Sequence, residues 1–267
     1  MPRGTLRRMS TLAVLRQLEG AMRIAFASAR TVVPVEGFTL YLTPGATVPY
    51  LSAAVPDETA PAGWAHALAA LPAAFAAHGS TARIETFAEL HPELLAAADE
   101  GGWRRSMVVP VMTLTPETFA EVTEPTPVGT FRSLDASDGA WLEAVLRAQH
   151  RAFGGDGEAG ALDWLPSLER GLRDGTVRGG AIDVAGAPVA GAVILLGGDA
   201  GELAGVWTEA SFRGQGYASR VCHEVLRAGF DGGLPLAWLS AAEGALRVYE
   251  RLGFVRVGTQ VNLEQPG

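Results

Sequence analysis

Residues 206–218 read Val206-Trp207-Thr208-Glu209-Ala210-Ser211-Phe212-Arg213-Gly214-Gln215-Gly216-Tyr217-Ala218, and this stretch holds the most informative pattern of the chain. A strand-like run ends here, two glycines follow, and a helical pattern begins at Gly216. Glycine allows backbone conformations that other residues rarely adopt, and it lets the backbone approach a ligand closely. The N-terminus of a helix adds unpaired N–H groups and a positive dipole end. The stretch therefore indicates a strand, a glycine loop and a helix that together suit a phosphate group.

Two widespread phosphate motifs do not fit this glycine loop. A Walker loop needs a lysine, and all 21 basic residues of the chain are arginine. A dinucleotide fingerprint needs glycine or alanine where this chain has Ser219, and it opens a long βαβ unit rather than lying late in the chain. A plain tight turn at Gly214 and Gly216 is the alternative that the glycines alone leave open.

Strand and helix patterns alternate around the loop. The expected elements are a strand at 130–135, helices at 141–153 and 163–174, strands at 178–184, 189–196 and 202–208, a helix at 216–230, a strand at 236–240, a helix at 244–252 and a strand at 254–263. Turn residues at 185–188 and 197–199 join the three consecutive strands. This order predicts an α/β (α+β) protein whose mixed sheet is packed between helices.

The N-terminal part carries a weaker copy of the second half of this plan. The copy consists of a helix that opens at Gly63 and ends near Gly79, a strand at 82–87, a helix at 92–100 and a strand at 106–114. From Gly63 to Gly102 the chain advances 39 residues, and from Gly216 to Gly253 it advances 37. The matched order and spacing predict an internal duplication.

Two motifs together resemble the GNAT superfamily of N-acetyltransferases. The family pattern Gln/Arg-x-x-Gly-x-Gly/Ala is matched by Arg213-Gly214-Gln215-Gly216-Tyr217-Ala218, between a strand and a helix. The late motif of the family, a tyrosine one helical turn before a Gly-Phe pair, is matched by Val248-Tyr249-Glu250-Arg251-Leu252-Gly253-Phe254. The resemblance covers roughly residues 128–265. It implies the GNAT acyl-CoA N-acyltransferase fold, with acetyl-CoA as co-substrate and no metal.

The resemblance also implies roles for individual residues. Main-chain groups of Val206, Trp207 and Thr208 would pair with the pantetheine arm of acetyl-CoA. The amides of consecutive residues would hold its pyrophosphate, namely Arg213, Gly214, Gln215, Gly216, Tyr217, Ala218 and Ser219. Many family members have an asparagine seven residues before the late tyrosine. This chain has Ala242 there, so one contact with the cofactor has no counterpart.

Acetyl transfer to an amine needs a proton acceptor for the amine and a proton donor for the departing thiolate. By the resemblance Tyr249 is the donor, and packing of its ring into the core is the alternative. Glu202 is the candidate base, because it lies 11 residues before Arg213, where several family members place a glutamate. An exposed carboxylate at a strand start is the alternative reading of Glu202, and Glu209 is the second candidate base. A regular strand would place four residues on one face: Glu202, Ala204, Val206 and Thr208.

A composition break divides the chain. Pro125 and Pro127 cannot continue a helix or a central strand, so residues 123–127 are predicted to be a linker. Residues 128–267 would form the acetyl-CoA-binding GNAT domain. Residues 1–122 would form a degenerate GNAT-like domain without a pyrophosphate loop, since residues 56–63 carry acids that repel phosphate and Ala98 replaces the late tyrosine. Such a tandem arrangement would let the N-terminal domain wall one side of the acceptor pocket.

Composition excludes several classes of protein. A net charge of −8 argues against a nucleic-acid binder, and no apolar run approaches the roughly 20 residues of a membrane span. Cys222 lies on an apolar helical stripe and is expected in the core, and the histidines show no metal-ligand spacing. The N-terminus has no signal-peptide pattern, which favours a cytoplasmic protein.

Taken together, these features predict an N-acetyltransferase that moves an acetyl group from acetyl-CoA to a primary amine of a small molecule or peptide. A non-catalytic acyl-CoA-binding or regulatory module with the same fold is the alternative. The identity of the acceptor stays open, and so does the oligomeric state, for which a homodimer is one option.

Overall fold

The computed structural model describes residues 10–43, 51–121 and 127–265. Their strands form one 11-stranded sheet in the order β1-β2-β3-β4-β11-β5-β10-β9-β8-β7-β6. The strands are β1 (Thr31–Val35), β2 (Phe38–Leu42), β3 (Ala53–Pro56), β4 (Arg83–Phe87), β5 (Arg104–Leu114), β6 (Thr130–Ser133), β7 (Val177–Val184), β8 (Ala187–Gly197), β9 (Ala200–Thr208), β10 (Ala237–Ser240) and β11 (Val255–Glu264).

Helices cover both faces of this sheet. They are α1 (Thr11–Ala29), α2 (Trp64–Ala76), α3 (Pro92–Glu100), α4 (Gly139–Ala152), α5 (Leu165–Asp174), α6 (Tyr217–Asp231) and α7 (Leu246–Arg251), with 3-10 turns η2 (Ala210–Phe212) and η3 (Glu243–Ala245). Every element predicted in residues 63–114 and 130–263 is present. The mixed sheet between helices is therefore confirmed.

The two halves of the chain repeat one arrangement. The series β3-α2-β4-α3-β5 of the first half recurs as β9-α6-β10-α7-β11 in the second. In the sheet, β3-β4-β11 on one side mirrors β9-β10-β5 on the other, and each half contains one parallel pair, β3 with β4 or β9 with β10. This repetition of order and pairing supports the internal duplication expected from the glycine spacing.

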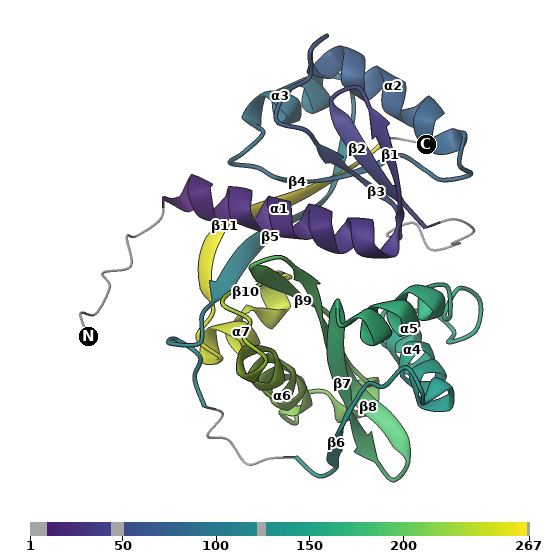
Figure 1. Ribbon diagram of the computed structural model, residues 1–267, viewed down its shortest axis with the longest axis vertical. Coiled ribbons are helices and arrows are strands. Elements are labelled where there is room, and N and C mark those ends of the chain that lie inside the picture. Colours follow the sequence, from purple (N-terminus) through teal and green to yellow (C-terminus); the bar gives the residue numbers. More distant parts are fainter. Residues whose placement is uncertain (1–9, 44–50, 122–126, 266–267) are drawn as a thin grey trace.

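The halves exchange their last strands. β5 of the first half pairs with β10 of the second, and β11 of the second half pairs with β4 of the first. β5 and β11 also pair with each other along most of their length, so they cross the junction together (Figure 1). Of the predicted linker, residues 123–126 lie outside the described residues, and the division at 123–127 stays a prediction.

Helix α1 lies across the junction of the halves (Figure 1). Its apolar stripe, which includes Leu15, Leu18 and Met22, packs in one cluster with Trp238 of β10. A Cβ atom added to Gly197 of β8 would collide with the main chain at Ala21, so the helix approaches the second half closely. Sequence patterns did not identify β1, β2 or β3, nor this bridging role of α1. The result is that the C-terminal end of α1 is placed beside the middle of the second half's sheet.

Candidate functional site

The parallel strands β9 and β10 pair only where they begin. The pairing joins Ala237 to Gly201 and Trp238 to Glu202. β9 continues to Thr208, whereas β10 ends at Ser240. Beyond the paired residues the two strands diverge, and their facing edges border a cavity. A strand edge of this kind offers N–H and C=O groups to an extended ligand.

A β-bulge interrupts β9 next to this cavity. Between Ala204 and Trp207 the register with β8 shifts, so that Gly205 and Val206 together face Ala192. Gly205 has a φ of 58°, a left-handed conformation that glycine adopts without strain. The bulge therefore depends on the glycine.

The bulge reverses the alternation of side chains along β9. Ala204 and Trp207 pack in the cluster beneath α4 and α5, whereas Leu203 and Val206 pack in the cluster beneath α6. A single face for Glu202, Ala204, Val206 and Thr208 was expected from a regular strand. That expectation is wrong beyond Ala204, because the extra residue at the bulge shifts the period by one position.

The glycine loop leads directly into α6. Gly214 and Gly216 have φ values of 73° and 85°, and nothing lies within 4 Å of a Cβ atom added to Gly214. No side chain caps the helix, and the Arg220 amide makes a bond to the Gly216 carbonyl, 3.0 Å away. The amides of residues 217–219 precede that bond at the uncapped helix N-terminus. Their role in holding a pyrophosphate stays a prediction, and their geometry suits it.

The larger side chains of this segment hold the loop in place. The Arg213 guanidinium donates to the carbonyls of Thr208 and Ala152, at 3.1 and 3.0 Å. The Tyr217 hydroxyl donates to the Val128 carbonyl at 2.9 Å, and its ring is buried. These side chains serve the loop's structure, so the main chain is the part of the segment that is available to a ligand.

Gln215 and Glu209, which the sequence also indicated as candidates, form polar contacts near the glycine loop. The Gln215 side-chain amide donates to the Ser211 carbonyl at 2.9 Å. Glu209, the second candidate base, forms an ion pair with Arg151 at 3.0 Å and does not line the cavity between the strands. Its carboxylate is therefore used in a surface contact.

Both predicted catalytic side chains line one cavity of about 460 Å³, which lies between the diverging strands. Glu202 comes from β9 and Tyr249 from α7. The second half also supplies Val206, Gln149 and Trp164. The first half supplies Phe26 of α1, Arg30 directly after α1, and Arg83, Glu85 and Met107 of β4 and β5. The structure thus brings the sequence-predicted pair together and adds a first-half wall, as the tandem interpretation expected.

Glu202 is half-buried and lines the cavity. Burial raises the pKa of its carboxyl to about 8, Glu85 adds to the rise, and Arg30 opposes it. A carboxyl with a pKa near neutrality is suited to act as a general base, because it can accept a proton and release it again.

Tyr249 is 8% exposed, and its ring stands edge-on to Phe254 with centroids 5.9 Å apart. Burial raises the pKa of its hydroxyl above the ordinary value, and Cys222 contributes to the rise. The hydroxyl therefore keeps its proton at neutral pH and can donate it. Ala242, which replaces the family's asparagine, also lines the cavity.

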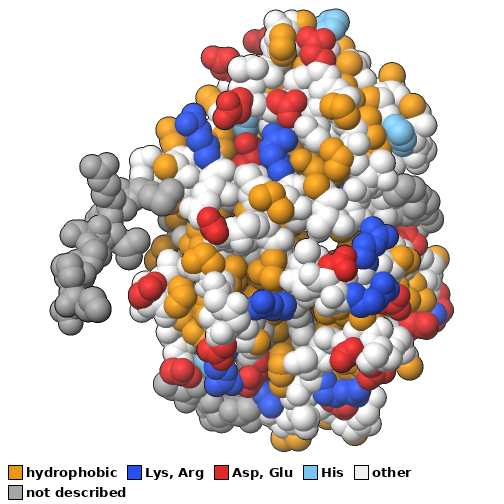
Figure 2. All heavy atoms as spheres, in the orientation of Figure 1, with side chains coloured by type: hydrophobic (Ala, Val, Ile, Leu, Met, Phe, Trp, Pro, Cys, Tyr) orange, Lys and Arg blue, Asp and Glu red, His pale blue; other side chains and the backbone are white. Residues whose placement is uncertain are grey.

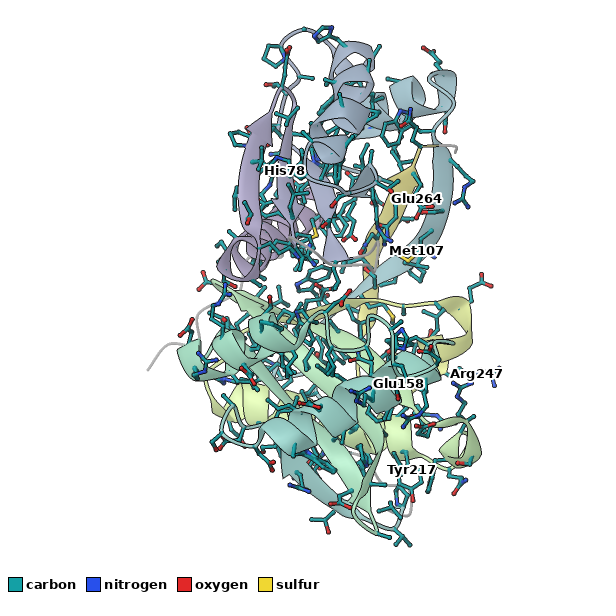
Figure 3. The ribbon with its side chains drawn as sticks, turned by 90° about the vertical axis from the view of Figure 1, so that its right-hand side faces the viewer. His78, Met107, Glu158, Tyr217, Arg247 and Glu264 are labelled. Carbon is teal, nitrogen blue, oxygen red and sulfur yellow. The ribbon has the colours of Figure 1, made fainter. Side chains whose placement is uncertain are left out.

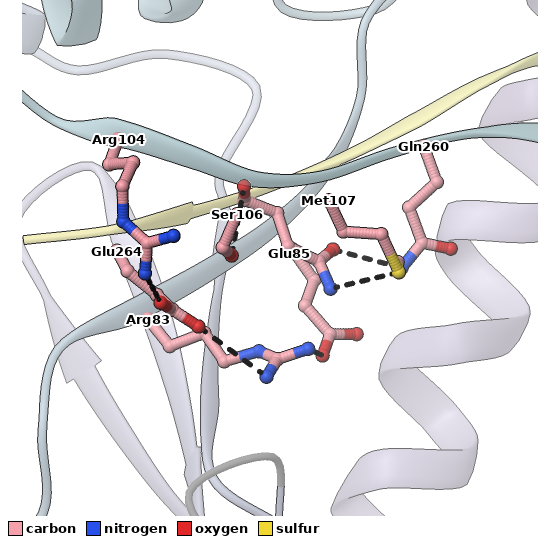
Figure 4. A network of polar contacts seen from close by, with 8 residues as sticks. Arg83, Glu85, Arg104, Ser106, Met107, Gln260 and Glu264 are labelled. Carbon is pink, nitrogen blue, oxygen red and sulfur yellow. Dashed lines mark hydrogen bonds and ion pairs between the residues drawn. The ribbon is translucent and has the colours of Figure 1, made fainter.

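Two residues of the cavity's first-half wall, Arg83 and Glu85, belong to a polar network that the sequence did not reveal. Arg83 lies 3.4 Å from Glu85 and 3.9 Å from Glu264, and Glu264 also pairs with Arg104 at 2.5 Å (Figure 4). β4 and β11 are neighbours only because the halves exchange strands. The one available signal was the alternation of charged residues at 83 and 85, which would have indicated a shared face.

The first half fills the place where the second has its open loop. The Asp57 carboxylate, directly after β3, accepts hydrogen bonds from Arg23 at 3.3 Å and Thr39 at 3.0 Å. The Ala62 amide, near the start of α2, donates to the Glu36 carboxylate at 2.9 Å. Asp57 thus corresponds to Glu209, which also directly follows its strand and pairs with an arginine. The difference between the halves is Glu36, whose carboxylate bonds near the helix start where a phosphate would need donors, in keeping with a degenerate first half.

Other features of the described residues bear on other kinds of site. Acidic and basic side chains are interspersed on the face shown in Figure 2. Within the described residues, no three His, Cys, Asp or Glu side chains are arranged to hold a metal ion, and no helix is long and apolar enough to cross a membrane. Cys222 is fully buried, as expected for a core residue, and burial raises the pKa of its thiol to about 12.

Comparisons with known proteins agree with this geometry. Residues 142–254 match the model of the acetyltransferase (GNAT) family. The fold is similar to that of a GCN5-related N-acetyltransferase from Kribbella flavida, with a TM-score of 0.75 and 24% identity over 95% of this chain and 96% of that one. No curated protein matches the chain.

Two more solved structures are similar over most of the chain. A GCN5-related N-acetyltransferase from Sphaerobacter thermophilus has a TM-score of 0.55 and 17% identity, covering 86% of this chain and 78% of that one. A tandem GNAT protein from the clavulanic acid biosynthesis pathway has a TM-score of 0.56 and 16% identity, covering 85% and 77%. The chain therefore has the tandem GNAT fold along its length, and its residues 142–254 form a domain of the GNAT acetyltransferase family.

Proposed function

We propose that the protein is an N-acetyltransferase that moves the acetyl group of acetyl-CoA to a primary amine of a small molecule or peptide. One observation carries the proposal: a carboxyl suited to act as a base and a buried tyrosine hydroxyl line the same cavity, between strands that diverge toward an open glycine loop. A cytoplasmic location, as favoured by the sequence, is part of this proposal.

The residues present fit acetyl-CoA. The edge of β9 beyond Glu202 is free of β10 and can pair with the amide groups of a pantetheine arm. Thr208 Oγ1 at the end of this edge is buried without a hydrogen-bond partner in the described part of the chain, so it is available to the ligand. The uncapped start of α6 and the space at Gly214 suit the pyrophosphate.

When bound, acetyl-CoA supplies the acyl carbon to which the amine nitrogen bonds as the carbon–sulfur bond breaks. Glu202 takes one proton from the substrate ammonium, which frees the nitrogen lone pair. Tyr249 gives its proton to the departing sulfur, so coenzyme A leaves as a thiol. The second proton of the amine nitrogen restores the tyrosine, and Glu202 releases its proton to water.

Thermal melting with acetyl-CoA, followed by thiol release with amines, tests the proposal. At 100 times its dissociation constant a ligand adds about 2.7 kcal/mol, which should raise the melting temperature of a chain of this size by roughly 5–10 °C. A rise together with amine-dependent thiol release supports the enzyme. A rise without thiol release for any amine would leave the non-catalytic acyl-CoA-binding module, and no rise would contradict both.

A further inference from the structure

The first-half wall of the cavity contains an arginine that lacks an anionic partner. Arg30 follows α1, and its guanidinium stacks on the ring of Phe26, with Cζ 3.8 Å from the ring centroid. Its Nη1 is buried and makes no hydrogen bond to any residue that the structure describes. A buried charged donor without a partner is costly, and a ligand that supplies an acceptor would remove this cost.

The neighbouring acids do not satisfy Arg30. Glu85 and Glu202 are close enough to influence its pKa, which burial lowers, but neither of them forms an ion pair with it. Glu85 is paired with Arg83, and Glu264 is shared between Arg83 and Arg104 (Figure 4). The acids of β4 and β11 at this end of the cavity thus already form ion pairs with Arg83 or Arg104. Among these residues, Arg30 is the cation that forms no ion pair.

Arg83 also has a donor without a partner. It lines the same cavity, and its Nε is also buried without a hydrogen-bond partner among the described residues. Two arginines of the first half therefore have unused donors at one wall of the cavity, opposite the candidate base Glu202 of the second half. Guanidinium groups bind carboxylates with paired hydrogen bonds, which gives both affinity and orientation.

The phosphates of coenzyme A are not the anions that Arg30 and Arg83 would bind. Its phosphates belong at the glycine loop, beyond the far end of β9. With a rise of about 3.3 Å per residue, Glu202 and Thr208 are at most about 20 Å apart along the strand, because the bulge between them shortens the path. Figure 3 shows Tyr217, the first residue of α6, well below Met107, which lines the first-half side of the cavity. The arginines are therefore placed for the acceptor.

We propose that the acceptor is an amine that also carries a carboxylate, an amino acid in the general sense, with its amine toward Glu202 and its carboxylate held by Arg30 and Arg83. The inference rests on the proposed acetyl transfer and gives the degenerate first half a function, since it supplies the carboxylate-binding wall.

The test compares matched acceptors in thiol-release assays with saturating acetyl-CoA. Each amino acid, such as glycine, phenylalanine or 4-aminobutyrate, is assayed beside its carboxamide and the amine that lacks the carboxyl group. Wild-type protein should prefer the carboxylate in kcat/KM by about 10- to 100-fold, the value of one charged hydrogen-bonded contact. Equal use of acids and amides would overturn the inference, as would a stronger preference for 2-aminoethyl phosphate.

Variants of Arg30 assign the preference to this wall. Arg30→Met should abolish the preference, so that the ratio of kcat/KM for acid to amide falls to about one, and Arg30→Lys should restore part of that ratio. A loss shared by acids and amides would come from the Glu202 carboxyl, whose pKa Arg30 lowers, and it cancels in the ratio. Arg16→Met, at an exposed position of the same helix, is the control and should leave the ratio unchanged. An unchanged ratio in Arg30→Met would contradict the inference, provided that acetyl-CoA still raises the variant's melting temperature and so shows that it is folded.

The inference and the proposed function can fail separately. If amides are acetylated as well as acids, the protein is an acetyltransferase and the carboxylate site is refuted. If no amine releases thiol, but calorimetry shows that amino acids bind to wild type and not to Arg30→Met, the carboxylate site stands and the acetyl-transfer proposal is refuted.

Discussion

The loop after β9 and the loop after β3 occupy corresponding places in the two halves, and they differ in what fills them. After β9, two glycines leave space above an uncapped helix. After β3, Asp57 is bound by Arg23 and Thr39, and the Glu36 carboxylate accepts a hydrogen bond near the start of α2. Gly63 still opens α2 with a φ of 87°, close to the 85° of Gly216. The ψ angles of the two glycines differ, at 154° for Gly63 and −1° for Gly216, so the turn before the helix has a different backbone conformation in each half. Near the start of α2 the Glu36 carboxylate already accepts an amide, whereas the start of α6 is uncapped.

The prediction that the first half lacks a pyrophosphate site would mean that a main-chain binding site was lost while the fold remained. The packing of each half depends on apolar clusters that a few loop residues do not touch. The first half is then available for another use, and it lines the cavity of the second half with charged side chains. The two halves would then differ in role: the second half binds the cofactor, and the first half lines the cavity.

The largest effect is expected for Glu202→Gln. The rate of thiol release should fall by about 10²- to 10⁴-fold, because the base is removed without a change of shape. In wild type the rate should rise with pH and level off above about pH 8, where the carboxyl is ionised. Glu85→Gln is the matched first-half control, since Glu85 lines the same cavity, and it should cost less than tenfold. Equal losses of rate in the two variants would show that Glu202 is not the general base.

Tyr249→Phe should lower the rate by about 10- to 100-fold, since loss of a proton donor removes part of the acid catalysis. The shift in melting temperature caused by acetyl-CoA should be unchanged, because the ring that packs on Phe254 is retained. A variant with full activity would show that Tyr249 is a packing residue, as Ala98 is at the corresponding position of the first half.

Glu202→Gln should also stabilise the fold in a pH-dependent manner. Folding raises the pKa of Glu202 from an ordinary 4.5 to about 8, so wild type loses stability between these pH values as the carboxyl ionises more easily when unfolded. The difference in melting temperature, variant minus wild type, should be small near pH 4.5, grow up to about pH 8 and then stay constant. Each kcal/mol corresponds to about 2–4 °C. A difference that does not vary with pH would show that Glu202 is well solvated.

The smallest effect concerns the filled loop of the first half. Arg23→Met should lower the free energy of unfolding by about 0.5–1 kcal/mol, because the Arg23–Asp57 pair is only partly buried. Chemical denaturation measures this change. The affinity for acetyl-CoA should stay the same, and a marked change would indicate that the first-half loop takes part in binding.

The sequence was sufficient for the order of helices and strands along the second half and for the position of the glycine loop, because periodicity and glycine positions report local backbone geometry. It did not predict the order of strands in the sheet, because β5 and β11 are exchanged between the halves. It also predicted a shared role for Glu202 and Tyr249 through their distance from the two motifs, and both residues line one cavity. The bulge at Gly205 was missed, although an isolated glycine in a strand is the usual sign of one. Arg30 could not be assigned from local pattern, because 172 residues separate it from Glu202 and only the exchange of strands and the path of α1 bring the two to one cavity.

Calorimetric titration of acetyl-CoA into three proteins tests most directly whether the second half binds the cofactor and the first half does not. Wild type should bind one molecule per chain. Gly216→Glu should bind none, because a carboxylate enters the glycine loop. Gly63→Glu bears the same substitution at the glycine that opens α2, also at a positive φ but with a ψ of 154° instead of −1°, and the folded variant should bind one molecule with unchanged affinity. Two molecules per wild-type chain, or loss of binding in Gly63→Glu alone, would contradict the assignment of the site to the second half.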